Sequence, residues 1–457
     1  MNPLCYTEIC MLRSFGKAWV VAINMGYGHE RAAFGLKDLA YGGNVIVAND
    51  YPGIPRHDRE LWKQSRSLYE FFSRLQPLPV VGQSLFDVID HFQRIPTFYP
   101  RRDLSQPTLQ VLEGYRWIEK QNFGKDLVDR LARRNGQLPF ISTFFLPAFA
   151  AEVYDYPGDI YCVICDADVS RAWVARDPKR SRINYFAPNG RVVERLQLYG
   201  VPRERIFLTG FPLPKSLVGG PEAKTIKRDL AERLCHLDPQ GIFAQKYAET
   251  LTRELGPRLC NIESKRPLTL TFCVGGAGAQ KQLGLDIVES LRKPILQKRL
   301  RVNLEAGTRP VIARYFENGI KALGLARALG DTLHIHTYAQ RKDYFNHFHQ
   351  TLRTTDILWT KPSELSFYTG LGIPIIIAPS IGSQEDFNRL WLQSVGGGMP
   401  QFDPAFTNEW LFDWIHSGGL ARFAWNGYIE APTHGAYRIE SIVTGQATSL
   451  ASLPLIV

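Results

Sequence analysis

Short apolar runs rich in β-branched residues alternate with longer amphipathic stretches along most of the chain. In the first half we expect strands at 19–23, 44–47, 140–145, 160–165, 183–187 and 205–209. After the first run, apolar side chains recur at helical spacing, at Ala32, Ala33, Leu36 and Ala40. Because alternating strands and helices are typical of a parallel sheet covered on both faces, the pattern predicts a doubly wound α/β domain.

The alternation resumes after a charged interruption. Further strands are expected at 268–274, 301–304, 332–335, 357–359 and 373–378. The two prolines of FPLPK (211–215) predict a domain exit, and the charged amphipathic stretch at 219–262 indicates a helical connector or insertion. Trp410 and Trp414 lie one helical turn apart and predict a packing helix near the C-terminus.

The length of 457 residues is more than one hydrophobic core usually supports. We therefore expect a first Rossmann-like domain at 1–215 and a helical connector or insertion at 216–265. A second Rossmann-like domain is expected at 266–400, followed by C-terminal packing helices and a tail at 401–457.

The formal charge of +10 favours anionic partners. Nucleotide sugars, acidic lipid surfaces and nucleic acid all fit that charge. No recognition-helix, ribonucleoprotein or zinc-finger pattern accompanies the basic residues, so we expect no nucleic-acid partner. No apolar run reaches the roughly 18 residues of a membrane span, which leaves only peripheral membrane contact open. The segment 69–102 mixes prolines, aromatics and arginines, and it indicates either an acceptor-facing loop for a lipid surface or a helical hairpin over the sheet.

The cysteines point to a reduced compartment. There are seven, an odd number, and Cys162, Cys165 and Cys273 lie inside apolar runs. Cys162 and Cys165 form a CxxC without a second pair at metal-ligand spacing, so buried strand cysteines are expected rather than a metal site. This usage predicts a cytoplasmic protein, with attachment at the inner face of a membrane left open.

Two glycine-rich turns follow the first strand of each half. They are GYGH, with Gly26, Gly28 and His29, and VGGAGAQ at 274–280. A glycine turn lets the backbone approach an anion, and the N-terminus of the following helix offers free N–H groups and partial positive charge. Glycines also permit a tight connection that binds nothing, so each turn alone is weak evidence.

The order of motifs adds a further signal. GYGHERAA is followed by YCVICDADVSRAWVARD, by NYFAPNGRVVERLQLYGVPRERIFLTGFPLP, by VGGAGAQ, and by TDILWTKPSELSFYTGLGIPIIIAPSIGSQEDFN. Over about 19–388 this order resembles the nucleotide-sugar glycosyltransferases with the GT-B fold. More narrowly it is similar to family 28, which includes the lipid-linked peptidoglycan N-acetylglucosaminyltransferase and the diacylglycerol glycosyltransferases. The resemblance implies two Rossmann-like domains facing across a cleft.

The resemblance also implies which residues bind each part of the substrates. The later glycine turn would hold the donor diphosphate through Gly275, Gly276, Ala277, Gly278 and Ala279. Gly26 and Gly28 would face the acceptor and the phosphates. Side chains after two later strands would contact the ribose or nucleotide (Ser363, Glu364) and the sugar (Gln384, Glu385, Asn388). A capping run at a helix start would also contain such residues.

The expected reaction is the inverting transfer of a sugar from a nucleotide donor to a hydroxyl acceptor. The resemblance implies that the donor is a UDP-sugar, and a lipid is one candidate for the acceptor. His29, Asp166 or Asp168 would accept the acceptor proton, because histidine titrates near neutral pH and the aspartates follow a strand end where open α/β sheets place ligands. The fold class usually works without metal, and no metal or other cofactor is expected.

Two positions depart from the family pattern. Ser170 stands where many members have histidine, and Phe367 stands where the family has the glutamate that holds the ribose. Glu364 is the candidate substitute. Two other functions remain open at this point: a non-hydrolysing UDP-sugar epimerase, which shares the architecture, and a non-catalytic protein that binds nucleotide sugars.

Overall fold

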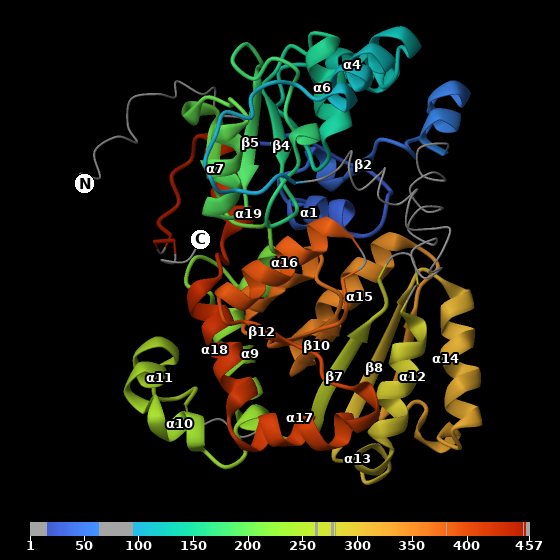
Figure 1. The fold of residues 1–457 in the computed structure, drawn as a ribbon, viewed down its shortest axis with the longest axis vertical. Helices are drawn as coiled ribbons and strands as arrows, with labels where there is room; N and C mark the ends of the chain where they lie inside the picture. Colours follow the sequence, from blue (N-terminus) through green and yellow to red (C-terminus); the bar gives the residue numbers. More distant parts are fainter. Residues whose placement is uncertain are drawn as a thin grey trace.

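A computed structural model describes residues 16–63, 95–260, 264–275, 278, 280–380, 382–450 and 452–453. Two α/β halves are stacked along the long axis, the first half uppermost in Figure 1. Each half contains a six-stranded, entirely parallel sheet with flanking helices. This confirms the predicted GT-B class of two Rossmann-like domains. The segment 69–102, for which two interpretations were open, falls largely outside the described residues.

The first sheet has the strand order β2-β1-β3-β4-β5-β6. Its strands are β1 (Trp19–Ala22), β2 (Ile46–Val47), β3 (Phe140–Ser142), β4 (Ile160–Val163), β5 (Ile183–Ala187) and β6 (Ile206–Leu208). β1, β3 and β4 are buried along their whole length, as the unbroken apolar runs require of strands covered on both faces. Among the described residues, the helices with full bounds in this half include α1 (Gly28–Gly35), α4 (Leu109–Gln121), α5 (Lys125–Asn135), α6 (Phe145–Val153) and α7 (Gly190–Leu198).

The second sheet has the order β12-β11-β10-β7-β8-β9, which places β7 and β10 side by side at the point where the strand order reverses. Its strands are β7 (Leu268–Cys273), β8 (Leu300–Gly307), β9 (Leu333–Thr337), β10 (Ile357–Thr360), β11 (Ile375–Ile377) and β12 (Gly398–Pro400). The helices are α12 (Lys281–Ser290), α13 (Arg292–Leu296), α14 (Pro310–Ala322), α15 (Arg341–Thr354), α16 (Ser383–Ser394), α17 (Thr407–His416) and α18 (Gly419–Glu430).

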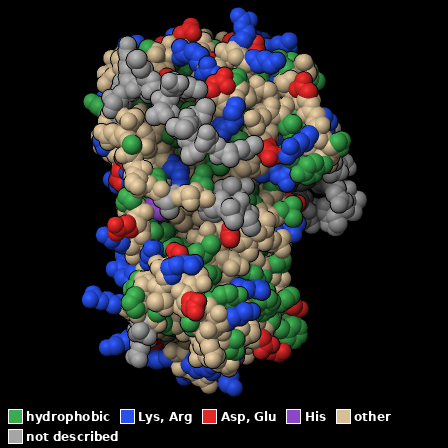
Figure 2. Space-filling model, turned by 90° about the vertical axis from the view of Figure 1, so that its left-hand side faces the viewer, with side chains coloured by type: hydrophobic (Ala, Val, Ile, Leu, Met, Phe, Trp, Pro, Cys, Tyr) green, Lys and Arg blue, Asp and Glu red, His purple; other side chains and the backbone are tan. Residues whose placement is uncertain are grey.

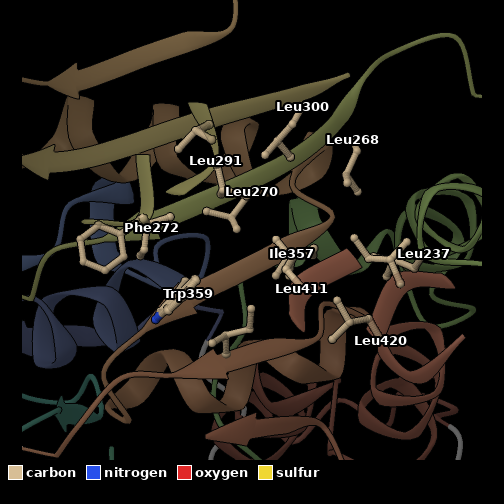
Figure 3. Close-up of a cluster of buried hydrophobic side chains, with 14 of the residues drawn as sticks. Leu237, Leu268, Leu270, Phe272, Leu291, Leu300, Ile357, Trp359, Leu411 and Leu420 are labelled. Atoms are coloured by element: carbon tan, nitrogen blue, oxygen red, sulfur yellow. The ribbon is translucent and has the colours of Figure 1, made fainter. Parts of the chain in front are cut away.

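The core of the second half joins its sheet to helices from distant parts of the chain. Leu270, Phe272, Ile357 and Trp359 extend from the strands toward helix side chains that include Leu411 (Figure 3). α17 is the expected packing helix, and its Trp410 meets Trp359 edge to face with ring centroids 5.4 Å apart. Such aromatic contacts add stability beyond the area they bury.

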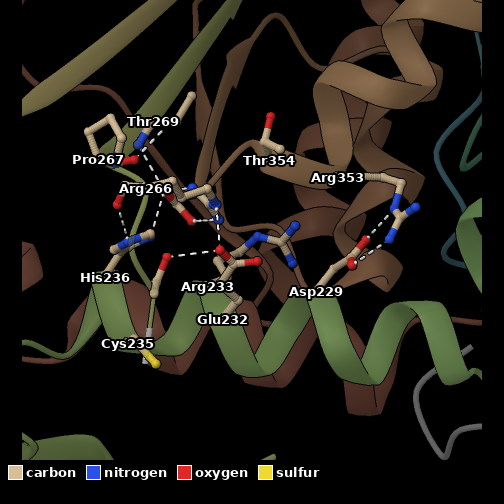
Figure 4. A network of polar contacts seen from close by, with 12 residues as sticks. Asp229, Glu232, Arg233, Cys235, His236, Arg266, Pro267, Thr269, Arg353 and Thr354 are labelled. Atoms are coloured by element: carbon tan, nitrogen blue, oxygen red, sulfur yellow. Dashed lines mark hydrogen bonds and ion pairs between the residues drawn. The ribbon is translucent and has the colours of Figure 1, made fainter. Parts of the chain in front are cut away.

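The segment expected as a connector contains α8 (Lys215–Val218), α9 (Lys224–Leu237), α10 (Ile242–Lys246) and α11 (Ala248–Leu255). α9 packs its apolar face into the second core. Arg233 on its buried side donates to the carbonyl oxygens of Thr355 and Gly372, both at 2.8 Å. Beside it, Arg266 binds both oxygens of Asp356 at 2.7 Å (Figure 4). The polar network therefore anchors α9 to the second sheet.

The last helix returns to the first domain. α19 (Gly435–Thr444) packs Ala436, Ile439 and Val443 against side chains of the first sheet. The chain thus passes between the domains twice, and the two passages touch, since a Cβ on Gly210 would lie 2.6 Å from the Cβ of Pro432. A further apolar cluster joins residues of both domains, among them Tyr27, Cys165, Phe211, Tyr344, Phe345 and Phe367.

Candidate functional site

The carboxyl ends of β1 and β4 meet those of β7 and β10 where the two domains join. Tyr27, after β1, accepts a hydrogen bond from the Thr308 amide, after β8, at 2.9 Å. Asn388, on α16, reaches the loop after β4. Open α/β sheets bind ligands at this edge, at the reversal of strand order. The sheet edges at which folds of this kind bind ligands therefore face each other.

The GYGH turn is closely approached by the second domain. Gly26 has φ +91°, a conformation that favours glycine, and its carbonyl accepts from Arg341 at 2.9 Å. A Cβ on Gly28 would lie 3.0 Å from Oε2 of Glu364. The predicted acceptor-side glycines and the predicted ribose ligand are thus neighbours, although they lie in different domains.

His29 lies near the start of α1 with its ring against Phe144, centroids 4.9 Å apart. Its Nδ1 is 2.8 Å from the carbonyl oxygen of Thr143, and because a carbonyl only accepts, Nδ1 carries the proton and Nε2 is left as an acceptor. Burial lowers the pKa of His29 to about 4, against the opposing effects of the Thr143 carbonyl and Glu364. The ring is therefore neutral at pH 7.

Asp166 contacts the second domain through Asn388. The Asn388 side chain is fully buried, donates to Oδ1 of Asp166 at 2.9 Å, and accepts from the Ala167 amide at 2.7 Å. Burial raises the pKa of Asp166 to about 6, although the Asn388 hydrogen bond opposes the shift. This carboxyl group can take up or release a proton near neutral pH.

Asp168 lies elsewhere. Its carboxylate faces the interior of the first domain, where Arg195 donates to Oδ1 at 2.9 Å and to Oδ2 at 2.8 Å. The Val169 amide adds a hydrogen bond to Oδ1 at 2.8 Å. The structure thus brings Asp166, but not Asp168, to the junction between the domains.

Glu364 begins a 3₁₀ helix, Glu364–Leu371, directly after Ser363. It forms a buried ion pair with Arg31 of the first domain. Phe367, at the position where the family carries glutamate, is 2% exposed and stacks on Phe211 with centroids 5.0 Å apart. Phe367 is therefore part of the core, while Glu364, one turn earlier, points to the site.

The VGGAGAQ turn is described in part, because Gly276, Ala277 and Ala279 lie outside the described residues. Gly278 has φ +72° and donates its amide to the Gly275 carbonyl at 2.8 Å, which makes a tight turn before α12. The Lys361 side chain lies against the turn, since a Cβ on Gly275 would be 2.6 Å from its Cε.

Lys361 also forms an ion pair with Glu385, one of three predicted sugar contacts at the start of α16. Glu385 and Asn388 are buried there and Gln384 is partly exposed. The sequence analysis assigned no role to Lys361, and it missed Arg31 and Arg341. Arg31 could have been found from the sequence, because it lies two residues after His29.

Metal and membrane features can be stated for the described part of the chain. Within it, no group of three or more His, Cys, Asp or Glu side chains could hold a metal ion. None of its helices combines the length and apolar character needed to cross a bilayer. On the face in Figure 2, basic side chains are interspersed with acidic ones over both halves.

A family model described as a domain of unknown function (DUF6938) matches residues 244–405. No curated protein matches the chain. Three solved structures that are similar in fold are low in sequence identity. UDP-GlcNAc 2-epimerase from Neisseria meningitidis, bound to UDP-GlcNAc, is 10% identical with a TM-score of 0.44, covering 70% of this chain and 80% of that one.

A putative UDP-N-acetylglucosamine 2-epimerase from Listeria monocytogenes is 13% identical with a TM-score of 0.46, covering 78% of this chain and 85% of that one. MurG from Acinetobacter baumannii is 11% identical with a TM-score of 0.43, covering 94% of this chain and 100% of that one. Similarity at this level leaves substrate and mechanism open.

Proposed function

We propose that this chain is an inverting GT-B glycosyltransferase of the family 28 type. It transfers a sugar from a nucleoside diphosphate donor, with uridine as the expected nucleoside, to a hydroxyl acceptor for which a lipid is one candidate. The proposed setting is the cytoplasm, with peripheral contact at a membrane if the acceptor is a lipid. The proposal includes no metal or other cofactor.

The observation that carries the proposal is the meeting of polar groups from both domains at the carboxyl ends of both sheets. Asn388 from α16 contacts Asp166 after β4, and Glu364 lies against Gly28 after β1. A donor held by the second domain would present its sugar to these first-domain residues. Two-domain placement of this kind suits a reaction between two substrates, since each domain can position one of them.

Asp166 is the proposed base. A base works best when its pKa is close to the working pH, and the pKa of Asp166 is raised by burial to about 6. It would remove the proton of the acceptor hydroxyl while the oxygen attacks the anomeric carbon from the side opposite the leaving diphosphate. His29 keeps Nε2 as an acceptor but is a weaker base, so its proposed part is to hold the acceptor by accepting a hydrogen bond from one of its hydroxyls.

The leaving diphosphate needs positive charge and N–H donors. We assign these to the Gly275–Ala279 turn at the start of α12 and to Lys361, which lies against Gly275. Preorganised donors aimed at a developing negative charge are often the largest catalytic term. On binding, the diphosphate would compete with Glu385 for the Lys361 ammonium group.

The test is to incubate the protein with a panel of uridine diphosphate sugars, with and without a lipid extract, and to follow nucleotide and products by mass spectrometry and the configuration of the donor sugar by NMR. A glycosylated product with stoichiometric UDP is expected. Conversion of the donor sugar without any acceptor would instead indicate an epimerase. Donor binding without turnover on any acceptor would indicate a binding protein. His29→Ala should lower turnover more than donor affinity, and a variant as fast as the parent excludes His29 from the reaction.

A further inference from the structure

Asn388, on α16, joins the second domain to the loop that follows β4 in the first. α16 lies on the side of the second half that is nearest the first half (Figure 1). The Asn388 side chain is 0% exposed, and its Nδ2 donates to Oδ1 of Asp166 at 2.9 Å and to the carbonyl oxygen of Pro362 at 3.4 Å. Its Oδ1 accepts from the amide of Ala167 at 2.7 Å. One buried amide group therefore contacts two consecutive residues of the first domain.

These contacts use the hydrogen-bonding groups of the Asn388 amide. An asparagine side chain has two N–H donors and one oxygen acceptor, and in Asn388 the nitrogen has two acceptors and the oxygen has a donor. The reversed amide would place its oxygen against the Asp166 carboxylate and its NH₂ group against the Ala167 N–H, so only one orientation is favourable. A sugar could reach this buried amide only by displacing one of these partners.

We propose that Asn388 is a positioning residue: from the second domain it holds the carboxylate of the proposed base and the backbone beside it. The inference rests on the proposed function and gives Asn388 a part other than the sugar contact predicted from the sequence. The hydrogen bond engages Oδ1 of Asp166, so Oδ2 is the atom that takes the acceptor proton. Asp166 is partly exposed, which lets an acceptor approach it. The base is then complete only while the two domains are in contact.

A second buried asparagine holds the same loop from inside the first domain. Asn189 is also fully buried, and its Nδ2 donates to the carbonyl oxygen of Ala167 at 2.9 Å. Its Oδ1 accepts from the Val192 amide at the start of α7. Asn189 thus holds the backbone that Asn388 holds, but its contacts do not involve the Asp166 carboxylate. The two asparagines therefore separate the effect of the loop from the effect of the carboxylate contact.

The Asn388 contact favours the ionised form of Asp166. Burial raises the pKa of Asp166 to about 6, and the Asn388 hydrogen bond opposes that shift, because an N–H donor stabilises a carboxylate more than a neutral carboxyl group. The other charged or titratable groups that act on Asp166 come from the 3₁₀ helix, α16 and the loops after β10 and β4: Glu364, Glu385, Lys361 and Cys165. Loss of the Asn388 amide should therefore raise the Asp166 pKa further.

The pH dependence of kcat/KM tests the assignment, because its acid limb reports the pKa of the base in the free enzyme. Wild-type kcat/KM should fall as the pH drops through about 6, where Asp166 takes up a proton. In Asn388→Ala the acid limb should lie about one pH unit higher. Asn189→Ala is the matched control, and it should lower stability without moving the limb. Asn388→Leu fills the space that alanine leaves, and it should move the limb in the same direction if the alanine variant does not fold.

Protein stability gives a readout that needs no turnover. The folded-state pKa of Asp166, about 6, lies above the ordinary value of 3.8, so the stability contributed by protonated Asp166 is lost as the pH rises through about 6. The difference in stability between proteins with aspartate and with asparagine at position 166 isolates this contribution. In the Asn388→Ala background its loss should extend about one pH unit higher, which urea denaturation between about pH 4.5 and about pH 8 measures.

An acid limb and a stability decline that both stay in place in Asn388→Ala would overturn the positioning role while leaving the proposed function standing. A uniform fall in kcat/KM at every pH would show a merely structural Asn388 and would also overturn it. A limb that moves equally in Asn189→Ala would trace the shift to the loop backbone, with the same consequence. Absence of glycosyl transfer by the wild type would overturn the proposed function, and the stability decline would still decide whether Asn388 controls the charge of Asp166.

Discussion

Two buried pairs of arginine and carboxylate differ in whether they lie within one domain or join the two. Within the first domain, Arg195 holds Asp168 through two hydrogen bonds of 2.9 and 2.8 Å, and a backbone amide adds a third. Between the domains, Arg31 pairs with Glu364 and also donates to the Tyr344 hydroxyl. Each arginine keeps one nitrogen without a partner in the described chain, Arg195 Nη1 and Arg31 Nε, so the two pairs differ in the domains that they join and in the bonds to the carboxylate.

The difference teaches which buried charges are fixed within one domain and which depend on the contact between the two. A carboxylate whose oxygens are both occupied has no reason to move, because any rearrangement leaves a charge uncompensated. The Arg31–Glu364 pair instead joins side chains of two domains, so its geometry depends on how the domains meet. Burial alone therefore does not distinguish a structural ion pair from one that takes part in function.

The largest expected effect comes from breaking the ion pair between Arg195 and Asp168. Asp168→Ala leaves Arg195, which is fully buried, without its anion, and we expect the free energy of unfolding to fall by about 3–5 kcal/mol. Chemical denaturation at pH 7 measures it. A loss below about 1 kcal/mol would show that water reaches Arg195, and the pair would then not be the fixed member of the comparison.

Asp166→Asn should affect turnover and leave the fold nearly unchanged. The two aspartates are two residues apart, but Asp166 faces the second domain, so its neutral amide removes the proposed base without stranding an arginine. We expect turnover to fall at least about 100-fold, with stability within about 1 kcal/mol of the parent. Glu113→Gln, at an exposed pair with Arg116, is the control. An active Asp166→Asn protein would remove Asp166 as base.

The pH dependence of stability should reveal Glu305, a buried residue on β8. Its folded-state pKa of about 8 lies above the ordinary glutamate value of 4.5, so between these values the unfolded chain has lost a proton that the folded chain retains. Stability contributed by the protonated form therefore falls as pH rises through this window and is lost above about pH 8. Glu305→Gln should lack the decline, gaining about 1–3 kcal/mol over wild type at about pH 8.5. Denaturation curves at about pH 5.5 and about pH 8.5 compare them, and parallel declines in both proteins would contradict the assignment.

The smallest expected change in stability is at the partly exposed edge of the contact between the domains. Arg341, which pairs with Glu30, is 24% exposed, so water can solvate it once the pair is broken. Glu30→Gln should lower the free energy of unfolding by no more than about 1 kcal/mol, and less at high salt. Thermal melts at low and high ionic strength measure it. A salt-independent loss of several kcal/mol would show that the Glu30–Arg341 pair behaves like the buried Arg195–Asp168 pair instead.

The apolar runs were sufficient to predict most of the sheets. The expected strand at 160–165 is β4, and that at 357–359 is β10, because unbroken β-branched or aromatic runs leave a buried strand as the simplest outcome. β12 was missed, since Gly398–Pro400 has no such run and forms only as an edge strand beside β11. The return of α19 to the first sheet was also missed, because helical spacing of 436, 439 and 443 shows an apolar face but not the surface that it covers.

The site was harder to predict than the fold. Sequence placed Asp166 and Asp168 together at a strand end, but only the loop geometry turns one toward the second domain and the other toward Arg195. Glu364 was found as a polar residue near the position of Phe367, whereas its pairing with Arg31 depends on how the domains meet. The diphosphate assignment of Gly276, Ala277 and Ala279 remains a prediction, because these residues lie outside the described ones.

Because α19 packs on the first domain, that domain is built from two segments that lie far apart in the sequence. A chain truncated just before Gly435 would lack α19. The side chains that α19 covers, among them Val20 and Val163, would then form an exposed apolar surface on the first domain. The two connections between the domains lie side by side, at Gly210 and Pro432. A fragment that ends near residue 215 would therefore lack the α19 side chains that cover this part of the first domain.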